Sequence, residues 1–322
     1  MRAIRVQRYG GPEVMELVEV DPPRPGPGQV LVRVAASGVN YVDTYQRSGI
    51  YQVPLPLMPG VEGAGTVVEV GEGVTDLRAG DHVGWVAAPG SYAEQVVVDA
   101  DRAIPLPAGI SDELAAAVLL QGLTAHYLCT STYAVREGDP VLVHAAAGGV
   151  GLLLTQMVKL RGGRVIATVS TDEKAALARD AGADEVIRYD RVDFTAEVRR
   201  LTGGEGLPVV YDGVGRTTFD GSLACLRPRG MLVLYGASSG PVPPFDPQRL
   251  NQGGSLFLTR PSLGHYTLTR EELLGRAGDV LGWVTSGRLR VRIGGRYPLA
   301  EARRAHEDLQ ARRTTGKLLL LP

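Results

Sequence analysis

A single carboxylate, Glu62, stands in the glycine-rich stretch MPGVEGAG at residues 58–65, directly before the Val-rich run TVVEVG. Three roles suit an acid in so bare a backbone: a metal ligand, a proton carrier, or a brace for a turn. A catalytic zinc site usually takes three converging thiolate, imidazole or carboxylate groups. The five histidines show no short ligand spacing, and the two cysteines, Cys129 and Cys225, are far apart. The stretch alone leaves the role of Glu62 open.

A second candidate is the small-residue turn in VLVHAAAGGVGLLLTQMVKL, which separates an apolar run from a helical pattern. In the fingerprint G-x-G-x-x-G, glycines allow a tight turn, close approach to a pyrophosphate, and close packing of helix on strand. Gly148 and Gly151 fit the second and third positions, and Ala146 takes the first. The pyrophosphate would lie on the N–H groups of a helix beginning near Gly149. A plain structural turn is the alternative, but the βαβ context favours nucleotide binding.

The end of the next apolar run, ATVSTDEK, bears on which dinucleotide is bound. An acid about 20 residues past the glycines would accept hydrogen bonds from the adenosine ribose and repel a 2′-phosphate. Ser170 stands where that acid is expected, and Lys174 follows four residues later. This favours NADPH, with Lys174 on the phosphate. Asp172 argues partly against it, and a solvated Lys174 at a helix start is the alternative.

Elements that would position these residues follow from the apolar pattern. Residues 139–187 alternate strand and helix as β, α, β, α, β, and further strand candidates lie at 207–215, 230–240 and 254–263. Apolar strands separated by helices predict a parallel sheet covered on both faces. The fold class is therefore α/β, with a doubly wound sheet of about six strands.

The first 120 residues instead predict an irregular, mainly β unit. Runs such as QVLVRVAASGV and GTVVEVG are β-rich, and DPPRPGPGQ is a loop. A helix is expected over 109–129, with Ser111 or Asp112 as its N-cap. The chain ends in a helix and the strand-like GKLLLLP, which is expected to return to the first domain.

Length and composition limit the class of protein. The chain has 322 residues, which suits two domains, with 44% hydrophobic residues, 21% charged residues and a net charge of -1. These values argue against a basic nucleic-acid footprint as the main role. No uninterrupted apolar run of about 18 residues occurs, and the N-terminus alternates like a strand. We expect a cytoplasmic protein with no membrane association.

Several separated motifs, taken in order, resemble the zinc-free quinone oxidoreductase branch of the medium-chain dehydrogenase/reductase superfamily, the relatives of ζ-crystallin. They are ASGVNYVDTYQRSGIY, PGVEGAGTVVEVGEGV, GDHVGW, HAAAGGVG, YDGVG, TRPSL and RRTTGK. The resemblance implies a GroES-like catalytic domain at residues 1–122 and 260–322. It also implies a Rossmann dinucleotide-binding domain at residues 123–259.

The same resemblance bears on metal binding. Zinc-dependent members carry a cysteine and a histidine where this chain has Asn40 and Val61, and four cysteines for a structural zinc are absent between residues 85 and 110. We therefore expect no metal. Glu62 is interpreted as a brace for the glycine turn, through backbone or arginine bonds, and His144 as a packed or backbone-bonded histidine.

The resemblance also implies a catalytic set on a loop and at the domain hinge. Tyr45 and Tyr51 would stack on a quinone or donate to its oxygen, although loop tyrosines commonly only pack. Gln121 and Thr124 would line the interdomain cleft. Arg47 is placed on the same loop. The candidate catalytic residues are Asn40, Asp43, Tyr45, Tyr51, Gln121 and Thr124.

For the cofactor, the resemblance places Lys174, Tyr189 and Arg312 around the 2′-phosphate, with solvation as the alternative for Arg312. Segments near residues 235 and 257 would approach the nicotinamide. The candidate cofactor residues are Ala147, Gly148, Gly149, Val150, Gly151, Ser170, Lys174, Tyr189, Tyr235, Gly236, Ser238, Phe257, Leu258, Thr259 and Arg312.

The function implied by the resemblance is NADPH-dependent reduction of quinones in the interdomain cleft, with the number of electrons per step left open. A second enzyme hypothesis is reduction of an activated carbon–carbon double bond in an α,β-unsaturated carbonyl. RNA binding or a structural, crystallin-like role is a third, disfavoured by the charge and by 6% aromatic residues. A homodimer or homotetramer is expected, with the sheet edge near 254–263 pairing between subunits.

Overall fold

The computed structural model describes all 322 residues, and the chain forms two compact units. Unit 1 comprises Met1–Leu123 and Thr267–Pro322, and unit 2 comprises Thr124–Tyr266. The expected boundaries fell after residues 122 and 259, so the second lies further along the chain. At that boundary Tyr266 stacks on Tyr127, with ring centroids 4.3 Å apart and planes 7° apart.

Unit 1 is built on a seven-stranded sheet in the order β14-β15-β3-β4-β5-β7, with β6 paired to β3, and a separate β1–β2 pair. Its strands are β1 (Arg2–Val6), β2 (Met15–Glu19), β3 (Gln29–Val39), β4 (Glu62–Val70), β5 (His82–Val86), β6 (Gln95–Asp99), β7 (Ile104–Pro105), β14 (Ile293–Pro298) and β15 (Lys317–Leu321). Its helices are α1 (Tyr41–Ser48), α2 (Asp112–Tyr127), α8 (Arg270–Thr285) and α9 (Ala302–Gln310), with short turns η1 (Pro12–Val14) and η4 (Leu299–Glu301).

The C-terminal run returns to the first domain, as the sequence predicts. β15 pairs antiparallel with β3, with Leu318 opposite Val39, and β14 lies parallel to β15 on its other side. Leu318 and Leu320 are fully buried with α9 residues in one core cluster. The last strand therefore lies inside the sheet to which strands from the first 105 residues belong, between β14 and β3.

Helix α1 corrects the expectation that residues 40–51 form a loop. Asn40 is its N-cap and donates its backbone N–H to Asp43 Oδ2 at 2.8 Å. Gly49 ends the helix in the left-handed conformation, with φ of 80°. The pattern N-x-x-D followed by glycine one residue past the helix is a start-and-stop signal, and it was present in the sequence.

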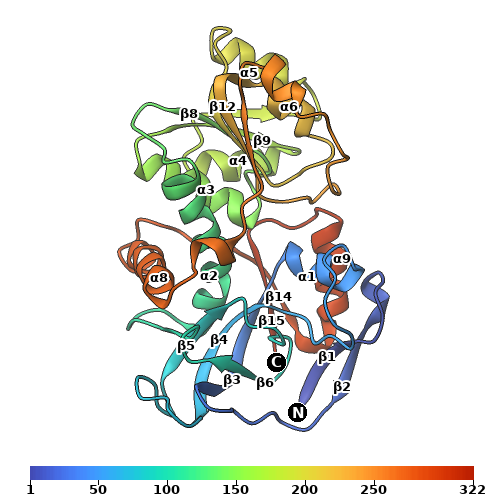
Figure 1. Cartoon of the computed structure of the whole chain (residues 1–322), viewed down its shortest axis with the longest axis vertical. Helices are drawn as coiled ribbons and strands as arrows, with labels where there is room; N and C mark the ends of the chain where they lie inside the picture. The colour runs from blue at the N-terminus through green and yellow to red at the C-terminus, as the bar shows by residue number, and fades with distance from the viewer. The chain divides into compact units, whose positions relative to one another are not determined.

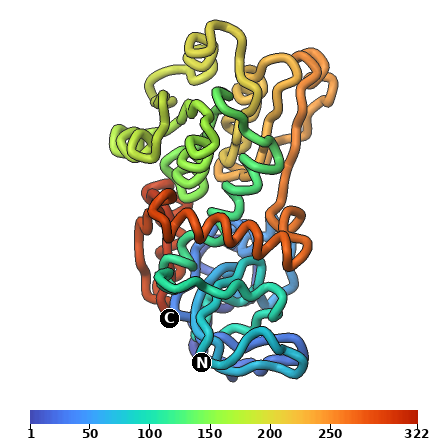
Figure 2. Tube along the Cα trace, turned by 90° about the vertical axis from the view of Figure 1, so that its left-hand side faces the viewer, coloured from blue at the N-terminus to red at the C-terminus, as the bar shows by residue number.

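Helices α2 and α8 lie near each other in unit 1 (Figure 2). The predicted N-cap of α2 is confirmed, because Leu114 N donates to Ser111 Oγ at 3.2 Å. Residues 112–132 are long and apolar enough to cross a membrane by composition, yet 67% of their most apolar window is buried, as in a core helix. Helix α8 was not expected, although Thr269 and Glu272 form a T-x-x-E start signal, and Glu272 N donates to Thr269 Oγ1 at 3.1 Å.

Unit 2 holds a six-stranded sheet in the order β10-β9-β8-β11-β12-β13, with every pairing parallel. Its strands are β8 (Pro140–Val143), β9 (Arg164–Val169), β10 (Glu185–Arg188), β11 (Leu207–Asp212), β12 (Leu226–Leu234) and β13 (Phe257–Thr259). Its helices are α3 (Gly149–Leu160), α4 (Asp172–Asp180), α5 (Phe194–Leu201), α6 (Phe219–Ala224) and α7 (Gln248–Gln252), with turns η2 (Leu128–Thr132) and η3 (Leu263–Tyr266).

The strand order is that of a doubly wound sheet. Helices α3 and α4 pack together, as do α5 and α6, and the two pairs cover the sheet (Figure 1). Sequence order reverses between β8 and β11, which are neighbours in the sheet. Ligands of such sheets bind at the carboxyl ends of the strands at this reversal. The predicted parallel, doubly wound sheet is confirmed.

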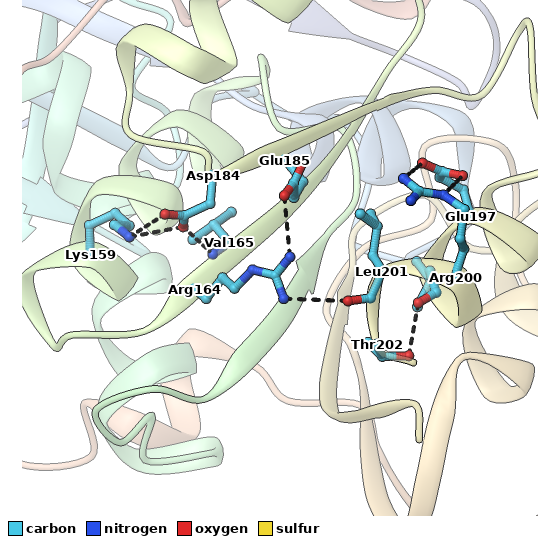
Figure 3. Close-up of polar contacts among 10 residues, drawn as sticks. Lys159, Arg164, Val165, Asp184, Glu185, Glu197, Arg200, Leu201 and Thr202 are labelled. Atoms are coloured by element: carbon cyan, nitrogen blue, oxygen red, sulfur yellow. Dashed lines mark hydrogen bonds and ion pairs between the residues drawn. The ribbon is translucent and has the colours of Figure 1, made fainter. Parts of the chain in front are cut away.

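The amino ends of the strands carry polar contacts that fix the sheet (Figure 3). Lys159 Nζ lies 2.8 Å from both oxygens of Asp184, which also accepts from Val165 N at 2.7 Å. Arg164 joins Glu185 at 3.2 Å and donates to Leu201 O at 3.5 Å. These contacts tie α3, β9, β10 and α5 together at the edge opposite the one where a ligand would bind.

Candidate functional site

The β8–α3 turn has the geometry that a pyrophosphate needs. Gly148 is the N-cap of α3, which begins at Gly149 as predicted. A Cβ added at Gly151 would lie 2.7 Å from Ala146 Cα, so only glycine allows the helix to pack this close to the turn. Ala145 makes the tight bend in the left-handed region, with φ of 51°. The backbone N–H groups at the start of α3 therefore face the carboxyl edge of the sheet.

At the end of β9, Ser170 and Lys174 lie together, with Nζ 3.4 Å from Oγ. Thr171 caps α4 by accepting from Lys174 N at 3.2 Å. Asp172, the acid that argued for a ribose contact, is instead bound by Arg188, and by Arg191 at 2.9 Å. The hydrogen bond from Arg188 lowers the pKa of Asp172. The carboxylate is thus committed to arginines at the end of β10, and the Ser170–Lys174 corner keeps a cationic character.

The segments after β12 and β10 reach the same edge of the sheet. Tyr235 and Gly236 follow β12 directly, and Ser238 N donates to Gly213 O at 3.2 Å. Tyr189 follows β10 and is 44% exposed. Unit 2 therefore gathers the predicted residues at 147–151, 170, 174, 189, 235, 236 and 238. Phe257, Leu258 and Thr259 make up β13 itself, and Arg312 belongs to unit 1, so its part in cofactor binding stays a prediction.

The predicted catalytic residues of unit 1 lie on or beside α1. Asp43 and Tyr45 are buried in the helix, and Tyr51 follows it with 42% exposure. The Tyr45 and Tyr51 rings meet edge to face, with centroids 5.3 Å apart. Gln121 lies in α2, and Thr124, also in α2, is the first residue of unit 2.

Glu62 was expected to brace the glycine turn through backbone or arginine bonds, but its partners are a lysine, an amide and the backbone of α2. It is the first residue of β4, fully buried, and it forms an ion pair with Lys317 of β15. It also accepts from Asn40 Nδ2 at 2.8 Å and from Leu120 N at 2.6 Å. Lys317 in turn donates to Asn40 Oδ1 at 2.7 Å. We call Asn40, Glu62 and Lys317 the buried triad.

The buried triad and its bond to Leu120 N connect the start of α1 with β4, β15 and α2, and the three side chains of the triad are buried. Lys317 is 1% exposed and Glu62 is 0% exposed. Charges so buried are tolerated only when they are paired and hydrogen-bonded. The side-chain amide of Asn40 donates both of its hydrogens within the protein, to Glu62 and to Gly38 O at 3.2 Å. Its role is therefore to hold the start of α1, and its amide hydrogens are not available to a substrate.

A second buried network connects α1 to α9 and has a fixed direction. Arg47 Nη1 donates to His306 Nδ1 at 3.0 Å, which leaves the hydrogen of the imidazole on Nε2. Nε2 then donates to the Tyr92 hydroxyl at 3.0 Å, and that hydroxyl donates to Asp43 Oδ2 at 2.8 Å. Asp43 Oδ1 is buried with no hydrogen-bond partner.

Burial governs the ionisation of this second network. Desolvation raises the pKa of Asp43 to about 7, against hydrogen bonds from Asn40 N and Tyr92 that lower it. Desolvation, and then the charge of Arg47, lower the pKa of His306 to about 3. The pKa of Tyr92 is raised well above its usual value by burial and by Asp43. At neutral pH the imidazole is uncharged, and Asp43 is near its titration midpoint.

The side chains around Glu62 are not a metal donor set. No group of three or more histidine, cysteine, aspartate or glutamate residues is placed to hold a metal ion. Asn40 and Val61 stand where the resemblance puts a cysteine and a histidine in zinc-dependent members, and Glu62 is paired with the ammonium of Lys317. The two cysteines are free and buried.

Sequence reasoning missed Tyr92, His306, Asp212 and the role of Lys317. Lys317 had one signal, because the chain has only three lysines and this one begins an apolar strand. Its partner Glu62 is 255 residues away, beyond any periodicity. His144 is packed and bonded through side chains, to Thr168 Oγ1 at 2.8 Å and Ser222 Oγ at 3.1 Å.

Comparison with known proteins gives matches along the whole chain. The alcohol dehydrogenase GroES-like domain model matches residues 26–108, and the zinc-binding dehydrogenase model matches residues 149–271. A quinone oxidoreductase of Pseudomonas aeruginosa is 48% identical, covering 100% of this chain and 99% of that protein. A 2-haloacrylate reductase of a Burkholderia species is 42% identical, covering 98% of each.

Solved structures agree with these matches. A mycobacterial protein in complex with NADPH is 53% identical, with a TM-score of 0.98 and 100% of both chains covered. The Escherichia coli quinone oxidoreductase in complex with NADPH is 44% identical, with a TM-score of 0.98 and 100% of both chains covered.

Proposed function

Because the chain belongs to the quinone oxidoreductase branch of the medium-chain dehydrogenase/reductase superfamily, we propose that it transfers reducing equivalents from NADPH to quinones. The observation that carries the choice of cofactor is the Ser170–Lys174 corner at the end of β9. It lacks a carboxylate free to bind the ribose hydroxyls, because Asp172 is held by Arg188 and Arg191. This supports the binding of a 2′-phosphate, which an NAD-type site would repel.

We propose that residues of unit 2 bind the cofactor. The N–H groups at Gly149, Val150 and Gly151 would hold the pyrophosphate, and Lys174 the 2′-phosphate. NADPH supplies a hydride from its reduced nicotinamide when bound. The protein's part is to fix the ring and the acceptor and to exclude water.

For the acceptor, we propose side chains of unit 1. Tyr51, partly exposed and in edge-to-face contact with Tyr45, is proposed to stack on a planar quinone or donate to its oxygen. The proposed reaction is zinc-independent, since a quinone carbonyl is already polarised and the buried triad holds an ammonium beside Glu62. Stoichiometric zinc in the purified protein, with activity lost on chelation, would contradict this part.

Reduction of an α,β-unsaturated carbonyl is the second candidate. The 2-haloacrylate reductase at 42% identity favours it, because its name specifies an activated carbon–carbon double bond. Steady-state kinetics with NADPH against a quinone and an α,β-unsaturated ketone, assayed side by side, separate the two. We expect a higher kcat/KM for the quinone, and a clear preference for the ketone would displace the first proposal.

Self-association is proposed through β13, which pairs only with β12 and leaves its other edge unpaired. Phe257 on this strand is 55% exposed. Pairing with a second copy would satisfy the open backbone groups and cover that ring. We propose a cytoplasmic homodimer or homotetramer, and light scattering on the purified protein tests it, with a monomer as the contradicting result.

A further inference from the structure

Asp212 is a buried carboxylate at the carboxyl end of β11, and hydrogen bonds reach both of its oxygens. Oδ1 accepts from Val214 N at 2.8 Å and Gly215 N at 3.0 Å. Oδ2 accepts from Thr218 Oγ1 at 2.7 Å and Ser222 Oγ at 2.8 Å. The side chain is 0% exposed, and none of the four donors is a cation. A carboxylate so placed fixes the conformation of the whole β11–α6 turn.

The β11–α6 turn is bonded through its backbone to the segment after β12. Tyr235 N donates to Asp212 O at 2.9 Å, and Ser239 N donates to Val214 O at 2.8 Å. A Cβ at Gly236 would lie 2.9 Å from Gly213 Cα, so the two strand ends are in direct contact. Displacing the turn would therefore displace residues 235–239 as well.

A directional chain of hydrogen bonds anchors Asp212 to the neighbouring strands. The hydroxyl of Ser222 donates its hydrogen to Asp212, so its oxygen accepts from His144 Nε2 at 3.1 Å. His144 Nδ1 must then accept from Thr168 Oγ1 at 2.8 Å. Burial lowers the pKa of His144, although Asp212 opposes the shift, and the imidazole is neutral. Serine, histidine and aspartate here form no hydrolytic triad, because Ser222 donates to aspartate and all three are buried.

Strand order tells which part of the cofactor this network serves. The pyrophosphate turn follows β8, and the Ser170–Lys174 corner follows β9 on one side of it. A dinucleotide laid across the carboxyl edge places its other half on the opposite side, over β11 and β12. Those are the strands whose ends Asp212 joins.

We propose that Asp212 is a positioning residue for the nicotinamide half of the cofactor, acting through the β11–α6 turn and residues 235–239. The assignment rests on the proposed function. It predicts that loss of the carboxylate weakens contacts to the nicotinamide half while the adenosine half binds as before. A merely structural role would weaken both halves together or neither.

The test compares two ligands on Asp212→Ala. NADPH probes the whole site, and 2′,5′-ADP probes only the adenosine half. We expect the Kd of NADPH to rise about tenfold, as for the loss of one hydrogen bond to the nicotinamide half, with the Kd of 2′,5′-ADP unchanged. Asp220→Ala is the matched control, because Asp220 lies on α6 with its side chain 78% exposed. We expect both dissociation constants to be unchanged in that variant.

Two results overturn the assignment: an unchanged Kd for NADPH in folded Asp212→Ala, or equal weakening of both ligands. If Asp212→Ala does not fold, Thr218→Val with Ser222→Ala removes the two donors to Oδ2, and the same comparison decides. If the wild-type chain binds neither ligand, the proposed function is wrong, and the assignment of Asp212, which rests on it, is wrong as well.

Discussion

At the scale of one residue, substitution of Lys174 tests whether the protein prefers NADPH to NADH. We expect Lys174→Ala to lower the preference for NADPH over NADH by about ten- to a hundredfold, because a charge-assisted hydrogen bond contributes about 1.5–3 kcal/mol. Comparison of kcat/KM for the two cofactors measures it. Lys159→Ala is the control, since Lys159 pairs with Asp184 at the opposite edge of the sheet. A preference ratio unchanged in Lys174→Ala would refute the 2′-phosphate contact.

Lys317 carries the prediction on stability. Lys317→Met keeps the length of the side chain but leaves Glu62 buried without its cation. We expect the free energy of unfolding to fall by about 3–5 kcal/mol, measured by urea denaturation. Adding Glu62→Gln should restore part of the loss, because the unpaired charge is removed. A loss below about 1 kcal/mol for Lys317→Met would show that the ion pair is dispensable.

Residues with local signals were predictable, and those defined by distant partners were not. Gly148, Gly151, Ser170 and Lys174 follow from spacing within one βαβ unit, and the structure places them on one sheet edge. Lys317 and Glu62 meet only because β15 returns to β3, after the whole dinucleotide-binding unit has been traversed. Spacing in the sequence contains no sign of that pairing.

At the scale of elements, a substitution at the N-cap of α8 tests how much one helix cap stabilises the protein. Thr269→Ala removes the acceptor for Glu272 N at the start of α8. We expect a loss of about 1 kcal/mol in the free energy of unfolding, measured by urea denaturation. Thr285→Ala, at the exposed end of the same helix, should cost clearly less. Equal losses in the two variants would contradict the capping argument.

The elements missed by pattern are short or lack a clear apolar stripe. Helix α1 has eight residues, and the residues on its buried face include Asp43, Thr44 and Arg47. Polar residues on the inner face hid the helix, because Asp43 and Arg47 belong to the second buried network and Thr44 bonds Tyr41 O within the helix. Helix α8 was missed for a simpler reason, since its glycines dilute the helical pattern between Thr269 and Ser286.

For the whole molecule, two buried groups oppose each other in the dependence of stability on pH. Asp43 titrates near pH 7 when folded and near 3.8 when exposed, so its contribution is present at low pH and is lost as pH rises toward 7. His306 titrates near pH 3 when folded and near 6.5 when exposed, so its contribution is present above pH 6.5 and is lost as pH falls. Between about pH 4 and 6.5 the two slopes cancel.

Asp43→Asn should expose the slope of His306. We expect the free energy of unfolding of this variant, relative to wild type, to rise by about 1.4 kcal/mol per pH unit from pH 4.5 to 6. Urea denaturation at several pH values measures the difference. His306→Gln should show the opposite slope. The same pH dependence in wild type and Asp43→Asn would mean that Asp43 titrates at its ordinary pKa.

At this scale the sequence predicted the parallel sheet, the return of the C-terminal strand and the family. The structure assigns residues 260–266 to unit 2, where Tyr266 stacks on Tyr127, and this was not predictable from the sequence. An aromatic pair 139 residues apart leaves no mark on local composition or periodicity.

The central claim is that this chain reduces quinones with NADPH and without a metal. The most direct measurement is the rate of NADPH oxidation by a quinone, after dialysis against a chelator, with NADH assayed in parallel. We expect full activity after dialysis and a kcat/KM for NADPH at least about tenfold above that for NADH. Loss of activity that added zinc restores, or equal use of the two cofactors, would contradict the account.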